Sequence, residues 1–410
     1  MGHFIDELRT AWRELLGGTI GLGLGIASYN PVSSMFFRSL EQEFGWSKAA
    51  AAISLIAMPI TAAVLPFAGM ALDRFGVRRV AFASTLCMAA SFVWLSLMNG
   101  SLRMFYAAFI ALNVLGCATG PIGYTRTIAF RFRRSRGTAL AIALMGIGLA
   151  GVVLPPLLTW VFAGWGWRGG YAFYAAAVLA AGVAAMWLMR ESRATNAQAE
   201  PAASGDTVTQ AVRRAAFWLL GMAIFLVSVA SLGFVSQFQS IIIEKGLEPK
   251  LAPTLLSTLA ASVFLSRLVV GWGLDTLNAE WVAAGALLMA ATGTLFWLVG
   301  GPSIAMAMTA ILLLGLSIGA ELDLMSFFCA RIFGMRHYGG IYGALAFFFY
   351  TGIAAGGIAY GAIHDRIGSY DTAIILSTCL FVLSAGLFIA LRSTAREVPL
   401  AEALAPEAAR

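Results

Sequence analysis

Long apolar segments alternate with short polar ones along almost the whole chain. An α-helix needs about 20 apolar residues to cross the hydrocarbon core of a membrane, and segments of that length recur twelve times. A transmembrane β-barrel would instead show segments of about ten residues with alternating polarity. The pattern therefore predicts an all-α membrane protein with twelve transmembrane helices. The predicted spans are 15–37, 49–72, 80–98, 104–128, 137–162, 169–188, 215–243, 251–274, 281–299, 304–330, 340–363 and 372–391.

A short motif after the second span returns in the second half of the chain. Gly69-Met-Ala-Leu-Asp73 lies between two apolar segments, and Gly271-Trp-Gly-Leu-Asp275 occupies the matching place 202 residues later. Gly116-x-x-x-Gly120 and Gly315-x-x-x-Gly319 match at nearly the same offset. Duplicated halves with a substrate site at their interface near the bilayer midplane form a known transporter plan. The repeat predicts two pseudo-symmetric six-helix bundles.

Polar segments divide the chain into five parts. Small and polar residues fill 190–214, which is typical of a flexible linker, and the tail is similar. Near the N-terminus Phe4, Leu8, Trp12 and Leu15 share one helical face, which predicts a short helix in the membrane interface. The predicted parts are an interfacial helix (1–14), an N-terminal bundle (15–189), a cytoplasmic linker (190–214), a C-terminal bundle (215–391) and a cytoplasmic tail (392–410).

Composition and charge agree with a membrane protein. Hydrophobic residues form 60% of the chain and charged residues 11%, whereas a soluble protein has about half and about a quarter. The net charge of +7 is not a nucleic-acid footprint, because most of the 27 lysines and arginines lie in segments on one side of the predicted spans. Positive charge resists translocation, so both termini are expected in the cytoplasm. We expect a monomeric multi-pass protein of a bacterial inner membrane, with the lipid bilayer as partner and no nucleic acid.

The predicted spans contain no recognisable pattern of catalytic residues. They hold no Ser–His, Asp–Asp or metal-ligand pattern, the three histidines lie outside them or at their ends, and the four cysteines have no paired spacing. A membrane sensor would usually add a soluble domain. The prediction is therefore a transporter without catalytic residues, metal or cofactor.

The segment from Gly69 to Arg79 resembles the Gly-x-x-x-Asp-Arg-x-Gly-x-Arg-Arg pattern of the major facilitator superfamily. Segments 44–47, 132–139, 166–168, 266–275 and 331–343 are similar to the monocarboxylate-transporter and oxalate–formate-antiporter group, so the resemblance covers nearly the whole chain. It implies alternating access and a small organic anion, bound by an arginine at the place of Arg267. Oxalate–formate relatives also carry a lysine in span 11, which this chain lacks, and this favours a single carboxylate.

Arg267 is the sharpest candidate for substrate binding on the residues alone. It precedes Asp275 by eight residues and so lies roughly 12 Å below the membrane surface. An arginine at that depth normally faces a cavity or a partner. Its planar guanidinium suits a carboxylate, because it can donate two parallel hydrogen bonds. The alternative is a structural salt bridge within the C-terminal half.

Glu321 and Asp323 are the candidates for proton coupling. They lie two residues apart on nearly opposite faces of span 10, and Ser317 shares the face of Glu321, whereas Gly319 shares that of Asp323. Glu321 is therefore favoured as cavity-facing and Asp323 as buried against helices. Either could be the permanent partner of Arg267. Alternatively, a substrate that takes the arginine would leave the carboxylate ready to bind a proton, giving symport.

Five further polar residues are weaker candidates for substrate binding. Arg126 could face a cavity, although snorkelling or helix pairing explains it better. Pro31 is expected to break the hydrogen-bond ladder of span 1, because proline cannot donate, and this could expose backbone groups next to Asn30. A proline kink is also common simply as shape. Inter-helix hydrogen bonding explains Asn113, Gln237 and Tyr350 as well as substrate contact does.

A group of charged residues at the repeated motif is assigned to gating. A carboxylate near the positive end of a neighbouring helix can hold two halves together when one side is closed. Orientation by positive charge alone explains some of the arginines, but not the aspartate. The gating candidates are Asp73, Arg74, Arg78, Arg79 and Asp275. The resulting hypothesis is proton-coupled symport of monocarboxylates, with anion exchange, efflux or a non-transporting sensor as alternatives.

Overall fold

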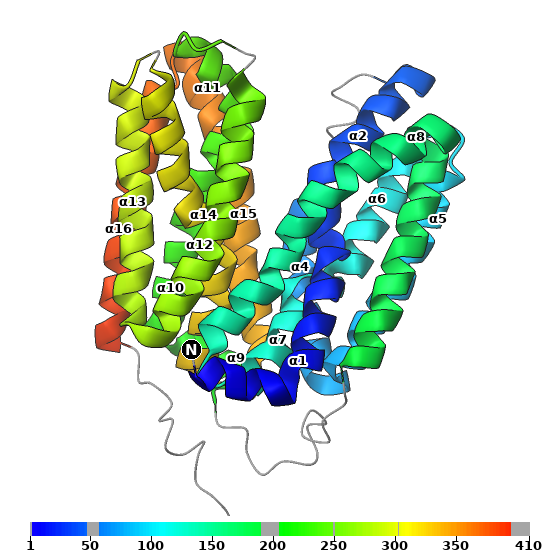
Figure 1. The fold of residues 1–410 in the computed structure, drawn as a ribbon, viewed down its shortest axis with the longest axis horizontal. Helices are drawn as coiled ribbons and strands as arrows, with labels where there is room; N and C mark the ends of the chain where they lie inside the picture. The colour runs from blue at the N-terminus through cyan, green and yellow to red at the C-terminus, as the bar shows by residue number, and fades with distance from the viewer. Residues whose placement is uncertain (1, 47–56, 190–204, 249–250, 302, 395–410) are drawn as a thin grey trace, which may run out of the picture. The chain divides into compact units, whose positions relative to one another are not determined.

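The computed structural model describes residues 2–46, 57–189, 205–248, 251–301 and 303–394, and these form helices (Figure 1). In these ranges the only β-type pairing is an isolated bridge between Gly205 and Gly334. The predicted all-α fold is confirmed. Parts of predicted span 2, of the linker and of the tail lie outside the described residues.

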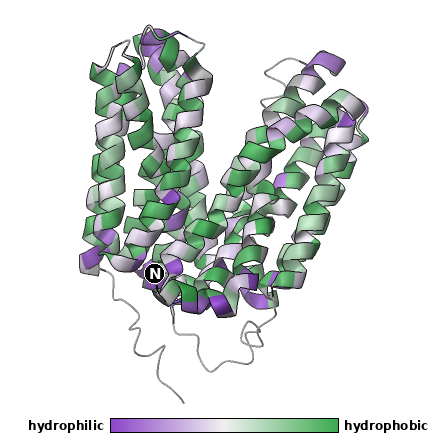
Figure 2. Ribbon diagram, viewed as in Figure 1, coloured by the Kyte–Doolittle hydropathy of each residue, from purple (hydrophilic) through white to green (hydrophobic). Residues whose placement is uncertain are grey.

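Nine of the helices in the described ranges are long and apolar enough to cross a membrane, and hydrophobic residues predominate along them (Figure 2). One of them, α8 (Arg136–Leu188), covers both predicted spans 5 and 6. Gly166 separates these two spans, because its backbone is non-helical with φ 63°. Glycine tolerates that conformation, since it has no Cβ.

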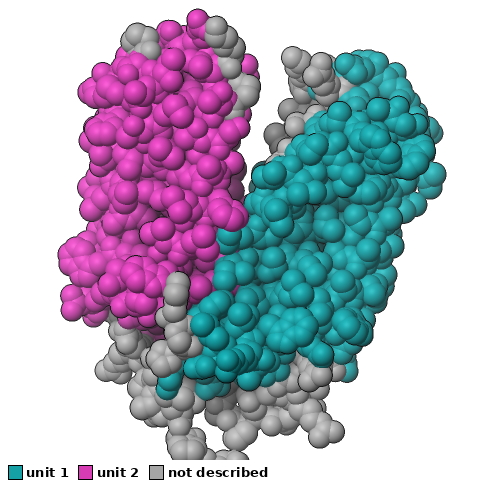
Figure 3. Space-filling model, viewed as in Figure 1, with its two compact units in different colours: residues 1–135, 142–200 teal, residues 136–141, 201–410 magenta. Residues whose placement is uncertain are grey.

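The chain forms two compact units, which Figure 3 shows in different colours. Unit 1 contains residues 1–135 and 142–200, and unit 2 contains residues 136–141 and 201–410. The first turns of α8 therefore cluster with the C-terminal half of the chain. The predicted domain boundaries themselves stay a prediction.

Unit 1 is built around a core of aromatic residues. Tyr29, Phe36, Phe92, Tyr171 and Tyr174 are almost fully buried, and the rings of Phe36 and Tyr171 stack at 4.2 Å between centroids. These five rings come from α2, α5 and α8, so the cluster holds helices far apart in the chain together. The helices are α1 (Gly2–Gly23), α2 (Ile26–Phe44), α4 (Ala57–Phe75), α5 (Val77–Ser96), α6 (Leu102–Gly116), the 3-10 turn η2 (Cys117–Thr119), α7 (Pro121–Arg131) and α8.

Two helix breaks in unit 1 contact each other. The break between α1 and α2 lies at Leu24-Gly25, and Ile26 donates its backbone N–H to the Thr119 hydroxyl of η2 at 3.0 Å. A side chain at Gly25 would collide with the carbonyl of Thr119. α2 begins five residues before Pro31 and continues through it, so the helix of the first span is interrupted upstream of Asn30-Pro31. The glycines upstream already provide the interruption.

Unit 2 consists of helices that pack in a regular pairwise order. α10 packs against α15 and α16, α12 against α14, and α13 against α14 and α16. α9 lies within the segment that we predicted as linker. The helices are α9 (Val208–Arg213), α10 (Ala215–Ser236), α11 (Phe238–Glu244), α12 (Ala252–Thr276), α13 (Ala279–Val299), α14 (Ile304–Phe333), α15 (Tyr338–Ile367) and α16 (Asp371–Thr394).

Candidate functional site

A stripe of small residues brings α12 and α14 into close contact. Gly315 and Gly319 lie against Ser262 and Ser266, and a Cβ on Gly319 would stand 2.8 Å from the Ser266 Cβ. Both serine hydroxyls donate to backbone carbonyls of α14. Asp323 follows Gly319 by one helical turn, so it continues the stripe that faces α12.

Arg267 and Asp323 form an ion pair at the end of this stripe. The Arg267 Nη1 donates to Asp323 Oδ1 at 2.9 Å, and the aspartate is fully buried. The second oxygen, Oδ2, is buried without a hydrogen-bond partner among the described residues. A buried carboxylate oxygen normally finds a donor. The pair is therefore incompletely satisfied on the aspartate side.

The guanidinium of Arg267 keeps donors to spare. Within the described part of the chain it makes one hydrogen bond, although a guanidinium carries five N–H donors. Its side chain is 9% exposed, and its remaining nitrogens are not among the fully buried atoms that lack a partner. The guanidinium therefore has more donors than the described residues use, at a depth where charge is costly.

Glu321 lies on another face of α14 and contacts α10. Its side chain is 4% exposed and accepts a hydrogen bond from the Ser231 hydroxyl at 3.4 Å. The Ser228 hydroxyl lies near the same carboxyl group without meeting hydrogen-bond geometry, and the buried Ser317 hydroxyl lacks a partner in the described ranges. Glu321 is thus as buried as Asp323 but is surrounded by hydroxyl groups and not by a direct ion pair.

In unit 1 the predicted residues Arg126 and Asp73 are brought together. The Arg126 Nε lies 3.1 Å from Asp73 Oδ1, with the two side chains 13% and 7% exposed. Arg126 comes from α7 and Asp73 from α4, so the pair joins the two helices. Of the other gating candidates, Arg74 lies over the Phe75 ring at 5.2 Å, while Arg78 and Arg79 belong to the first turn of α5.

Asp275 makes a different set of contacts from Asp73. Its two carboxylate oxygens accept hydrogen bonds from the backbone amides of Gly137 and Thr138 at 2.6 and 2.7 Å, at the start of α8. Gly271 makes this approach possible, because a Cβ there would stand 2.6 Å from the Ala141 Cβ. A carboxylate at a helix N-terminus is stabilised by free N–H groups and by the helix dipole. All of these residues belong to unit 2.

The weaker substrate candidates lie on or next to different helices. Asn113 is buried and donates to the carbonyl of Phe109 in its own helix at 2.9 Å. Tyr350 lies half-buried on α15. Asn30 lies on α2, and its side chain is outside the described part of the structure. Gln237 accepts a hydrogen bond from the Tyr370 hydroxyl at 3.2 Å.

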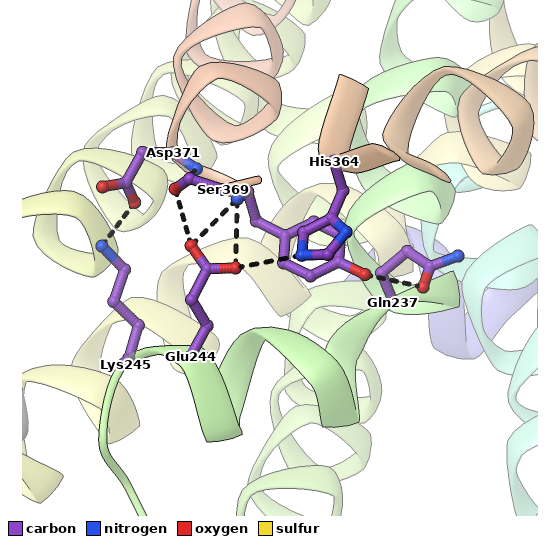
Figure 4. Close-up of polar contacts among 7 residues, drawn as sticks. Gln237, Glu244, Lys245, His364, Ser369 and Asp371 are labelled. Atoms are coloured by element: carbon purple, nitrogen blue, oxygen red, sulfur yellow. Dashed lines mark hydrogen bonds and ion pairs between the residues drawn. The ribbon is translucent and has the colours of Figure 1, made fainter. Parts of the chain in front are cut away.

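Gln237 belongs to a polar network that joins α11, α15 and α16 (Figure 4). Glu244 accepts hydrogen bonds from the Ser369 hydroxyl at 2.6 Å and from the Tyr370 amide at 3.0 Å. The Tyr370 ring stacks on His364 at 4.2 Å between centroids, and Lys245 pairs with Asp371 at 2.5 Å. The network ties the end of α11 to the turn between α15 and α16, so Gln237 is occupied structurally.

A matching glutamate in unit 1 was missed by the sequence reasoning. Glu43 precedes Glu244 by 201 residues and bonds to Arg168 at 2.7 Å and to the Trp167 indole. These hydrogen bonds lower the pKa of Glu43 below its usual value. Each unit thus uses a glutamate at the end of its first membrane segment to hold its last helical hairpin. The near-identical offset of the two glutamates was the available signal.

Glu7 was missed as well. Its carboxylate accepts hydrogen bonds from the backbone amides of Arg133, Arg134 and Ser135, each at 3.0 Å. The partners lie more than 120 residues away and are backbone groups. No pattern of residue types marks such a contact, so the sequence carried no signal for it.

Comparisons with known proteins agree with this architecture. Residues 15–357 match the family model described as the Major Facilitator Superfamily. The chain is 25% identical over 292 residues to the MFS-type transporter YcxA of Bacillus subtilis (strain 168), which covers 68% of this chain and 69% of YcxA.

Solved structures of the same fold cover nearly the whole chain. The E. coli fucose:proton symporter FucP aligns with a TM-score of 0.75 at 14% identity, covering 95% of this chain and 99% of FucP. The proton:xylose symporter XylE aligns with a TM-score of 0.72 at 14% identity, covering 94% and 96%. The human organic anion transporter MFSD10 aligns with a TM-score of 0.66 at 16% identity, covering 93% and 99%. The chain therefore belongs to the Major Facilitator Superfamily, a family of membrane transporters and not of enzymes.

Proposed function

We propose that the chain is a secondary active transporter that moves small organic anions, in particular monocarboxylates, together with protons. The observation that supports this substrate class is Arg267, a deeply placed guanidinium that makes one hydrogen bond in the described part of the chain. A carboxylate fits such a group, because both of its oxygens accept parallel N–H donors. The body of the substrate is expected to be apolar, like the residues that dominate the spans.

Substrate binding is proposed to loosen the pair between Arg267 and Asp323. The substrate carboxylate takes the remaining donors of Arg267, and its negative charge competes with Asp323 for the same positive charge. A buried carboxylate that loses its positive partner binds a proton more readily, because the charged form is costly in a low-dielectric interior. Asp323 then carries the coupled proton. Glu321 is a second acceptor, held by Ser231 at 3.4 Å.

Asp275 and the Asp73–Arg126 pair are proposed to act in gating. Asp275 holds the first amides of α8, a contact that can open without breaking any helix. Arg126 is assigned to gating together with Asp73, because its Nε lies 3.1 Å from an aspartate of the motif that is assigned to gating. Arg74, Arg78 and Arg79 are proposed to favour a cytoplasmic placement of this end, with both chain termini on the same side of a bacterial inner membrane.

The comparisons support a role in transport, whereas the proposals of an anionic substrate and of proton coupling are supported by individual residues of this chain. FucP and XylE are named as proton symporters of sugars, and MFSD10 as an organic anion transporter. Their identity to this chain is too low to transfer a substrate. The proposal that the substrate is an anion rests on Arg267, and the proposal that a proton is co-transported rests on Asp323 and Glu321.

Uptake into proteoliposomes tests this function. The purified protein, which we expect to be a monomer, is reconstituted into lipid vesicles. A proton gradient is imposed across the vesicle membrane, and the accumulation of labelled monocarboxylates inside the vesicles is measured. We expect accumulation in the wild type and in Arg103→Gln, an exposed arginine on α6, and none in Arg267→Gln. Equal accumulation in Arg267→Gln and Arg103→Gln would refute the anion site.

The same vesicles test the coupling. Asp323→Asn and Glu321→Gln are measured with and without the gradient. At least one variant should equilibrate the substrate without concentrating it. If both still concentrate it, the proton role of these carboxylates is wrong. If the wild type needs a second anion inside the vesicle instead of a gradient, the protein is an exchanger.

A further inference from the structure

The N-terminal helix α1 packs against the turn between α7 and α8. Phe4 stacks on Phe132 at 6.1 Å between centroids, Glu7 binds the amides of residues 133–135, and Glu14 pairs with Arg131 at 3.2 Å. Phe4 and Glu7 lie one helical turn apart before the kink at Ala11, and Glu14 follows after it. Both parts of α1, before and after this kink, therefore contact residues 131–135.

Glu7 makes the most specific of these contacts. One carboxylate satisfies three successive backbone amides at 3.0 Å, so both of its oxygens are used. Hydrogen bonds to an ionised acceptor are roughly twice as strong as neutral ones. They also fix the direction of the three peptide planes, which neither the Phe4 stacking nor the Glu14 ion pair can do.

The held turn leads directly into the gating contact. Ser135, whose amide binds Glu7, is followed by Arg136, and the next two amides, of Gly137 and Thr138, bind Asp275. Two carboxylates from distant parts of the chain thus bind amides within a run of six residues. The conformation of residues 133–135 determines how the amides at 137 and 138 are presented, because only one residue lies between the two sets.

We propose that Glu7 is a positioning residue for the gating contact of Asp275, so that the N-terminal helix controls how firmly α8 is held at its start. This inference rests on the proposed function in one respect, that the Asp275 contact opens and closes during transport. Glu7 does not touch substrate or Asp275. It acts by fixing the conformation of the turn at residues 133–135, which precedes the two amides that donate to Asp275.

Local structure around α1 supports a separate, adjustable segment. The backbone of Ala11 is non-helical, with φ −121° and ψ 16°, so a kink separates the residues before it from the part that continues toward α2. Ile5, Trp12 and Leu16 on the opposite face are between 43% and 50% exposed. A displacement of this segment would release Glu7 and loosen residues 133–138 together.

Hydrogen–deuterium exchange of the substrate-free protein tests the inference. Glu7→Gln should accelerate exchange at the amides of Gly137 and Thr138 about tenfold, the change expected when a contact worth about 1.4 kcal/mol is lost. Asp6→Asn, which removes a neighbouring exposed carboxylate of the same helix, is the matched control and should leave these amides unchanged. Faster exchange at residues 133–135 alone, with residues 137 and 138 at the wild-type rate, would overturn the proposal.

The coupling must be reciprocal, which provides a second variant. Asp275→Asn should accelerate exchange at the amides of residues 133–135, although Asp275 does not touch them. An unchanged rate there would also overturn the proposal, even if Glu7→Gln did not fold. Because no substrate enters these measurements, they can fail while carboxylate uptake succeeds, and they can succeed while carboxylate uptake fails.

Discussion

The two copies of the Gly-x-x-x-Asp motif have the same place in their repeats but different partners. Asp73 lies 3.1 Å from the side chain of Arg126, within unit 1. Asp275 accepts from two backbone amides at the start of α8, within unit 2. The buried arginine of unit 2, Arg267, pairs instead with Asp323, an aspartate outside the motif.

The difference shows how a duplicated motif can separate two tasks. In unit 1 one aspartate serves both as the motif residue and as the counter-ion of the buried arginine. In unit 2 the second aspartate, Asp323, takes the arginine and leaves Asp275 to bind a helix start. The position equivalent to Arg267 at the offset of 202 is Leu65, which is buried and apolar. A buried arginine four residues before the motif glycine is therefore a property of the second copy, and this supports the assignment of substrate binding to Arg267.

The largest expected effect on stability comes from removing one partner of each pair. Asp323→Asn leaves Arg267 without a counter-ion and should lower the free energy of unfolding by about 3 kcal/mol, as when one partner of a buried ion pair is removed. Asp73→Asn should cost less, because Arg126 and Asp73 both keep some exposure. Thermal unfolding of the two variants in detergent measures the order. An equal or larger loss for Asp73→Asn would show that the two pairs do not differ as described.

The glycine of the second copy should be next in effect. Gly271→Ala places a Cβ 2.6 Å from Ala141 and 2.8 Å from the Gly137 carbonyl, and such overpacking costs about 1–3 kcal/mol. Gly285→Ala on α13 is the control, because its Cβ would meet nothing within 4 Å. Alanine is favoured over glycine in a helix, so the control should be neutral or slightly stabilising. The midpoints of thermal unfolding of the two variants are compared with that of the wild type. Similar midpoints for both variants would argue against the close approach of Gly271 to α8.

Asp275→Asn should have a moderate effect. The neutral amide keeps one acceptor oxygen but loses the charge that favours the helix N-terminus, a loss of about 1 kcal/mol. Uptake should lose rate while the substrate concentration for half-maximal uptake stays the same, since the binding residues are intact. A changed affinity without a changed rate would assign Asp275 to the substrate site.

The smallest effect on stability is expected at Glu43, the glutamate of unit 1 that matches Glu244 of unit 2. The pKa of Glu43 lies below its usual value because Trp167 and Arg168 donate to its ionised form. The stabilisation is therefore fully present above the unfolded-state pKa of about 4.3 and is lost as the pH falls through the lower folded-state value. Between about pH 6 and about pH 3 the midpoint of thermal unfolding should fall slightly more in the wild type than in Glu43→Gln. Glu41→Gln is the control and should follow the wild type. Identical pH profiles for all three proteins would show that Glu43 contributes nothing.

Much of the fold follows from the sequence, because membrane spans are set by local apolar length. The repeat included two Gly-x-x-x-Gly segments, and the close contact of Gly319 with Ser266 gives a physical reason for the second of them. The helix break at Leu24-Gly25 in the first span was not predicted. Gly25 touches the carbonyl of Thr119, which lies 94 residues away. Such a contact depends on tertiary packing that local patterns do not contain.

The site was only partly predictable. Depth along the helix identified Arg267, Glu321 and Asp323, because a charge inside a span is rare whatever it contacts. Depth does not identify the partner, which depends on how α12 and α14 are rotated against each other. Contacts to backbone amides, as made by Glu7 and Asp275, were harder still, since every residue offers the same amide.

Binding of carboxylates to two variants of the purified protein tests the central claim most directly. A panel of monocarboxylates is screened by thermal shift with the wild type and with Arg267→Gln/Asp323→Asn, which removes both charges and so leaves no unpaired buried ion. The account predicts that at least one carboxylate stabilises the wild type and that the double variant loses this stabilisation while still unfolding cooperatively. The same carboxylate stabilising both proteins equally would contradict the assignment of Arg267 as the anion site.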